Sequence, residues 1–308
     1  MKNIGKVRNQ GIELTLNTTN IKTKKFEWTS NFNIAFNQNR VTELAEGQNA
    51  LLTAAQFDQN FNQQSSYIAI KGKSMGTMYG YIYDGTYKLD EFDKSGNTYT
   101  LKANVPHFSG ENNTQPGMPK YRDINGDGVV DSNDCTVIGN GLPTHTGGFT
   151  NNFAYAGFDL SIFFQWSYGN DILNANRLFF ESSWNTSRDL NQFASYANRW
   201  TFDNPTSDIP RAINSASNKV FSSRIIEDGS FLRLKTLTLG YTLPKAVVTR
   251  LHIDNLRVYF AAQNLFTITD YSGYDPEVSI RNNALTPGLD FSAYPRARQF
   301  SFGLHIGF

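Results

Sequence analysis

The sequence lacks several features that would place it in a common class of protein. Its 308 residues contain a single cysteine, Cys135, which excludes an intrachain disulfide framework. No stretch approaches the roughly 20 consecutive apolar residues that a membrane-spanning helix needs. A net charge of +1 leaves no basic footprint for nucleic acid. The first ten residues, MKNIGKVRNQ, contain no apolar segment, so we do not expect them to direct export.

The sequence is rich in aromatic residues, with 24 Phe, 15 Tyr and 4 Trp, although its mean hydropathy is −0.44. A strand places successive side chains on opposite faces, so an amphipathic strand can be polar on average and still have one apolar face. The last nine residues follow this pattern, with Phe300, Phe302, Leu304, Ile306 and Phe308 on one face. Such a strand fits either a soluble sandwich or a membrane barrel.

Six further segments show the same alternation. They begin near Ile12, Phe26, Phe149, Phe158, Phe231 and Leu256. Three short connections join them in pairs: the polar TNIKTKK, a tight turn at Ala156 and Gly157, and PKAVVTRLHID. In the fifth segment Leu232 and Leu234 are out of phase with Leu237 and Leu239, which predicts a β-bulge near Lys235.

The connections alternate between short and long. The long ones span roughly 40–145, 170–227 and 268–295. Outer-membrane barrels have short periplasmic turns and long extracellular loops, so this alternation favours an all-β antiparallel transmembrane β-barrel over a sandwich. Because single-chain bacterial barrels have an even number of strands, at least 8, we expect seven strands to be the C-terminal part of a larger barrel.

Several segments resemble one family, the SusC/RagA-type TonB-dependent outer-membrane transporters. They include VRNQGIELTLN, KYRDINGDGVVDSNDCTVIG, SSRIIEDGSFLRLKTLTLGYTLP, LRVYFAAQNLFTITDYSGYDPE and the terminal FSFGLHIGF. The resemblance implies a barrel of about 22 strands with an N-terminal plug domain. It also implies TonB-driven import of glycans or oligopeptides with a SusD-like surface lipoprotein. Neither a plug domain nor a signal peptide is recognisable in the 308 residues.

Residues 123–134, DINGDGVVDSND, have the spacing of an EF-hand calcium loop. Oxygen-bearing side chains stand at positions 1, 3, 5, 9 and 12, glycine stands at position 6, and a backbone carbonyl is expected at position 7. The predicted Ca²⁺ ligands are Asp123, Asn125, Asp127, Val129, Asp131 and Asp134. The alternative is an acidic loop held by Asx hydrogen bonds.

A second candidate site lies in the 170–227 connection. Phe179, Trp184, Tyr196 and Trp200 could stack on sugar rings, and Arg199 could bind hydroxyls or carboxylates. Packing within the loop, or contact with a SusD-like partner, is the alternative for the same residues.

No catalytic constellation is recognisable, because the four histidines are dispersed and Cys135 has no neighbouring base. We therefore do not expect an enzyme.

In the terminal strand, Phe302, Leu304, Ile306 and Phe308 resemble the signal read by the barrel-assembly machinery. Two other functions remain open: a secreted soluble glycan-binding module and a passive porin-like barrel.

Overall fold

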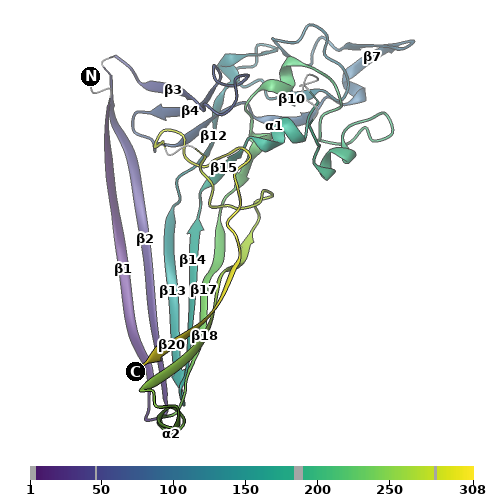
Figure 1. The fold of residues 1–308 in the computed structure, drawn as a ribbon. Helices are drawn as coiled ribbons and strands as arrows, with labels where there is room; N and C mark the ends of the chain where they lie inside the picture. Colours follow the sequence, from purple (N-terminus) through teal and green to yellow (C-terminus); the bar gives the residue numbers. More distant parts are fainter. Residues whose placement is uncertain (1–4, 46, 184–189, 281–282) are drawn as a thin grey trace.

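The computed structural model describes residues 5–45, 47–183, 190–280 and 283–308. Its main feature is a seven-stranded antiparallel sheet whose strands follow one another in chain order (Figure 1). The strands are β1 (Gly5–Lys22), β2 (Phe26–Leu44), β13 (His145–Tyr155), β14 (Phe158–Tyr168), β17 (Phe231–Thr242), β18 (Asn255–Thr269) and β20 (Gln299–Gly307). This arrangement confirms the predicted strand count and fold class.

The short connections lie together at one end of the sheet, called here the turn end. Tyr155 and Phe158 are paired across a two-residue turn in which both Ala156 (φ 48) and Gly157 (φ 86) have positive φ, as a type I′ hairpin requires. The connection from β17 to β18 contains α2 (Lys245–Val248) and the 3₁₀ helix η6 (Thr249–Leu251). Gly307 pairs with Asn255, so the last strand also finishes at the turn end, as the alternation predicts.

The predicted β-bulge is present. The register between β17 and β18 shifts between Leu234 and Thr236, and the register between β14 and β17 shifts beside it. The extra residue, Lys235, brings Leu232 and Leu234 onto the same face as Leu237 and Leu239. Their change of phase in the sequence is therefore a local irregularity within one continuous strand.

One face of the sheet is apolar across all seven strands. Successive registers align its side chains in rows, and many are exposed: Ile12 is 74%, Leu304 67% and Phe302 82% exposed. We call this surface the apolar belt; it comprises Ile12, Leu14, Leu16, Phe32, Ile34, Phe36, Phe149, Phe153, Leu160, Ile162, Phe164, Leu232, Leu234, Leu237, Leu239, Val258, Phe260, Ala262, Phe300, Phe302, Leu304 and Ile306. An exposed patch of this extent is typical of a surface that another apolar phase covers.

Aromatic side chains mark both margins of the apolar belt. At the turn end, Phe26 packs edge-on against Tyr155, and Phe158 lies 4.4 Å from Tyr241 between ring centroids. At the opposite end, Tyr168 stacks on His145 with 5.0 Å between ring centroids. Aromatic girdles at both interfaces accompany the apolar band of outer-membrane barrels.

The long connections fold into a separate layer, the cap, at the end of the sheet opposite α2 (Figure 1). They are not open loops, because each contains at least one short strand, and the first two also contain helical turns. The cap strands are β3 (Ala50–Ala54), β4 (Ser65–Ile70), β5 (Thr77–Gly80), β6 (Tyr83–Thr86), β7 (Phe92–Ser95), β8 (Thr98–Leu101), β9 (His107–Phe108), β10 (Pro119–Tyr121), β11 (Val129–Val130), β12 (Thr136–Asn140), β15 (Asp171–Asn174), β16 (Ile226–Asp228) and β19 (Leu289–Asp290). Its helical segments are α1 (Asn176–Phe180), η1 (Leu89–Glu91), η2 (Ser132–Asp134), η3 (Ala194–Asn198), η4 (Ala216–Lys219) and η5 (Ser223–Ile225).

The buried hydrophobic core lies in the cap. Its largest cluster includes Phe61, Tyr67, Met78, Phe179 and Leu289, drawn from all three long connections. Only a few apolar residues of the seven long strands, such as Val41 and Leu234, are buried in the described chain. The cap is therefore built like a water-exposed domain, and the sheet is not. Among the described residues, no helix is long and apolar enough to cross a membrane.

Candidate ligand-binding surfaces

The aromatic residues proposed from the sequence as ligand contacts are buried. Phe179, Tyr196 and Trp200 are only 3%, 6% and 2% exposed. The Phe179 ring packs against other cap rings, and Arg199 lies over the Tyr196 ring at 5.4 Å. In this fold the three rings are buried, which favours the packing alternative over ligand contact for them. Trp184 lies outside the described residues.

The final ligand of the predicted calcium loop is turned into the loop. Asp134 is fully buried; one carboxylate oxygen accepts from the N–H groups of Ile124 (2.7 Å) and Asn125 (3.3 Å), and the other accepts from Asp131 (2.8 Å). Burial raises the pKa of Asp134, but the three N–H donors outweigh it and the pKa lies below its usual value. Bidentate binding of Ca²⁺ by Asp134 would have to break these bonds.

The other side chains of this loop form a chain of Asx-type hydrogen bonds. Asp123 accepts from the N–H groups of Gly126 (2.7 Å) and Gly128 (2.8 Å), and Asn125 and Asp127 each accept from the residue two positions ahead. These oxygens are hard donors of the type that Ca²⁺ prefers. Within the described ranges, however, no three carboxylate, histidine or cysteine side chains are arranged to hold a metal ion. The donor chemistry fits calcium, and the position of Asp134 does not.

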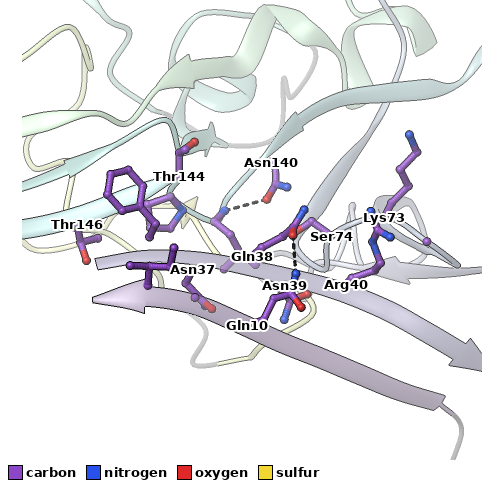
Figure 2. A pocket seen from close by; sticks show the side chains of 16 residues that line it. Gln10, Asn37, Gln38, Asn39, Arg40, Lys73, Ser74, Asn140, Thr144 and Thr146 are labelled. Atoms are coloured by element: carbon purple, nitrogen blue, oxygen red, sulfur yellow. Dashed lines mark hydrogen bonds between the residues drawn. The ribbon is translucent and has the colours of Figure 1, made fainter. Parts of the chain in front are cut away.

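A polar cleft of about 930 Å³ opens where β13 separates from β2. Beyond Phe36, β2 no longer pairs with β13; the backbone of Val41 is instead bonded to Lys73 and Gly72. We call this space the amide cleft. Figure 2 shows amide and hydroxyl side chains along it, with Arg40 and Lys73 at one end and Thr144 and Thr146 at the other. Its remaining polar side chains are Gln10, Asn37, Gln38, Asn39, Ser74 and Asn140.

A second cavity, of about 660 Å³, lies between the 170–227 and 268–295 connections. We call it the aromatic-amide cavity, because aromatic rings and amide side chains line it together. Tyr274 and Tyr294 are 85% and 92% exposed, so their ring faces are free in this chain. The lining includes Phe180, Phe193, Tyr274, Tyr294, Asn174, Asn176, Asn191, Gln192 and Asp290.

Sequence reasoning missed the residues of the aromatic-amide cavity. Tyr274 and Tyr294 belong to a connection that offers no periodic pattern, and they are separated from Phe193 by 80 residues or more. Their neighbours Gly273 and Pro295 were the available signal, since such residues mark turns and connecting segments run over the protein surface. Only the packing of the cap shows that these segments meet.

The proposed assembly signal lies at the exposed edge of the sheet. Phe302, Leu304 and Ile306 point to the apolar-belt face of β20, and the terminal Phe308 is 92% exposed. The far edge of β20 has no partner strand among the described residues. The geometry is compatible with the predicted signal and with a simple interfacial anchor.

No family model matches the chain. Among curated proteins, it is 34% identical to TonB-dependent receptor P3 of Formosa agariphila over 313 residues, covering 100% of the chain and 29% of that receptor. It is 26% identical to TonB-dependent receptor SusC of Bacteroides thetaiotaomicron, covering 100% of the chain and 27% of SusC. The chain thus spans less than a third of the length of these relatives.

Solved structures give the same pattern of coverage. The RagAB peptide transporter superposes with a TM-score of 0.75 at 24% identity, covering 100% of the chain and 30% of the transporter chain. The RagAB peptide importer in its open-open state gives a TM-score of 0.71 at 25% identity, with 99% and 29% covered. At 24% identity, the RagAB peptide transporter shows a shared fold and nothing more.

Proposed function

Because this chain belongs, as a portion, to the SusC/RagA-type TonB-dependent receptors, we propose that it forms the C-terminal part of the barrel of an outer-membrane nutrient importer. The apolar belt carries this proposal. An apolar face across seven antiparallel strands, with a conventional core only in the cap, is the pattern of a sheet that stands in lipid. In this orientation the turn end is periplasmic and the cap is extracellular.

The two edges of the sheet support a larger ring. β1 and β20 each pair with a strand on one side only within the described chain. Unpaired N–H and C=O groups in lipid cost several kcal/mol each, so an open sheet would not persist there. We propose that strands from the remainder of the receptor pair with both edges and close a barrel of about 22 strands.

The proposed cargo is an oligomeric nutrient, a glycan or an oligopeptide, and the proposed partner is a SusD-like lipoprotein at the cap. Of the described surfaces, the aromatic-amide cavity fits such a ligand best. Aromatic faces stack on sugar rings or apolar side chains, while amides bond to hydroxyls and peptide groups. The RagAB peptide importer, whose name describes peptide import, is similar in structure to the chain at 25% identity.

Uptake measurements separate this proposal from its two rivals. In cells that express the complete receptor, uptake of the nutrient should stop when TonB is deleted or the proton gradient is collapsed. A passive porin-like barrel would continue to admit the solute. A secreted glycan-binding module would give a folded, monomeric chain in buffer without detergent, and that result would overturn the barrel assignment.

Substitutions in the aromatic-amide cavity test the ligand contact. Tyr294→Ala and Tyr274→Ala should each weaken ligand binding by roughly tenfold, because each removes an exposed aromatic face. The matched control is Phe202→Ala, since Phe202 is also exposed but does not line the cavity. Unchanged affinity in both tyrosine variants would exclude this cavity as the binding site.

A further inference from the structure

Two arginines face each other on the outer side of the sheet, beyond the apolar belt. Arg8 of β1 pairs directly with Arg40 of β2. The register runs without a break from Ile12 and Phe36, through Gln10 and Gln38, to this pair. Because strand side chains alternate with a period of 2, both arginines lie on the face that carries the apolar belt.

The distance of the two arginines from the apolar belt gives their depth relative to a bilayer. The pair is four residues beyond the Ile12–Phe36 row, which corresponds to about 13 Å along the strand. With a strand tilt of about 40°, the rise along the membrane normal is about 10 Å. The guanidinium groups therefore stand outside the hydrocarbon layer, at the level of lipid head groups, on the cap side.

The pair is electrostatically unfavourable as it stands. Like charges directly opposite each other on neighbouring strands destabilise a sheet. Elsewhere on the same hairpin, charges that face or adjoin each other are matched: Lys6 lies 2.7 Å from Glu43 and Lys22 lies 3.6 Å from Glu27. Both arginines are exposed, and neither is ion-paired to a carboxylate among the described residues.

The surroundings of the pair suit an anion. A small cavity of about 100 Å³ is lined by Arg8, Gln10, Gln38 and Arg40. Gln10 donates to the Gln38 carbonyl oxygen at 3.1 Å, and this bond holds the two amides side by side below the arginines. Lys73 adds a third positive charge at the same end of the amide cleft (Figure 2).

We propose that Arg8 and Arg40 bind the phosphate of a glycolipid head group in the outer leaflet of the membrane. Two guanidinium forks can each donate two N–H groups to phosphate oxygens, so one phosphate would satisfy both and cancel their repulsion. The glutamine amides would bond to the hydroxyls of the attached sugar. This assignment rests on the proposed outer-membrane location.

The test uses the complete receptor in phosphatidylethanolamine nanodiscs that contain either a phosphorylated disaccharide glycolipid or its dephosphorylated form. Native mass spectrometry reports the lipid retained, and thermal unfolding reports stability. Arg8→Gln with Arg40→Gln should lower retention of the phosphorylated lipid about thirtyfold. In the dephosphorylated lipid, the same double variant should unfold at a higher temperature than the wild type, because the repulsion is gone.

Arg250→Gln is the matched control, because Arg250 is an exposed arginine at the turn end. It should leave lipid retention unchanged. The proposal would be overturned if the double variant retained as much phosphorylated lipid as the wild type, or if the control lost as much lipid as the double variant. It would also be overturned if the double variant were less stable than the wild type in the dephosphorylated lipid. Displacement of the lipid by millimolar inorganic phosphate would assign the site to free phosphate instead. Failure of the receptor to insert into nanodiscs would refute the membrane location itself.

Discussion

A charged residue in the middle of the apolar belt should distinguish the two faces of the sheet. Leu237 points to the belt face between Ile162 and Ala262. The 11 residues of β14 rise about 33 Å, and a tilt of about 40° leaves about 25 Å along the membrane normal. Ile162 is four residues from one end of β14 and six from the other, so Leu237 lies near the bilayer midplane.

An arginine at the midplane of a membrane barrel costs about 2 to 4 kcal/mol on the lipid face. Leu237→Arg should therefore lower the free energy of unfolding by that amount. Thr238→Arg is the control, because Thr238 follows directly in β17 but faces inward between Ser161 and Ala261. Its expected cost is below about 1 kcal/mol, since lumen-facing positions contact water.

The assay is reversible guanidinium unfolding of the complete receptor in phospholipid bilayers, followed by tryptophan fluorescence. The difference between the two variants is the informative quantity, because both introduce the same side chain at neighbouring positions. If Thr238→Arg cost as much as Leu237→Arg, or more, the belt would not be the lipid face and the orientation proposed for the sheet would be wrong.

Three further predictions address the cap and the C-terminus. Calorimetric titration should show weak calcium binding, with a Kd on the order of 10⁻³ M, because the Asp134 carboxylate is already bonded to backbone N–H groups. Asp127→Ala should abolish the heat of calcium binding. If the wild type gave no heat of binding, the segment would be only a loop held by Asx hydrogen bonds. Burial raises the pKa of Asp275, but its 2.6 Å ion pair with Arg233 lowers the pKa by more. The pKa of Asp275 therefore lies below its usual value. The stability that this pair contributes should be complete above a pH of about 4 and should be lost as the pH falls below it. Thermal unfolding between pH 7 and pH 3 should therefore show a smaller loss of stability in a doubly substituted Arg233→Met, Asp275→Leu variant than in the wild type. Deletion of Phe308 should reduce the amount of receptor assembled in the outer membrane with little change in its unfolding midpoint, whereas equal assembly would make Phe308 an interfacial anchor only.

The local features of the sheet could be predicted from the sequence because they depend on neighbouring residues. The direction of a side chain along a strand has a period of 2, so the faces of the terminal strand and of its six predecessors follow from residue order alone. The bulge at Lys235 and the turn at Ala156 and Gly157 are equally local, and both are present. The alternation of short and long connections then determined which strand ends lie together.

The long connections could not be predicted in the same way, because they have no period and their contacts are distant in sequence. The sequence left open whether Phe179 and Trp200 contact a ligand or pack within their loop, and the cap buries both. Asp134 occupies the right position for a calcium ligand, but its direction depends on which backbone groups fold against it. Tyr274 and Tyr294 meet the residues of another connection only through the packing of the cap.

Residue order is enough to show the seven amphipathic strands, the residues that share the apolar face, and the family that the chain resembles. Which residues the strands bring side by side depends on the tertiary structure. Arg8 and Arg40 are 32 positions apart, and only the register of β1 against β2 makes them direct neighbours. Alternation is set by each strand's own backbone, whereas register and cap packing are set by hydrogen bonds and burial between segments that are far apart in the chain.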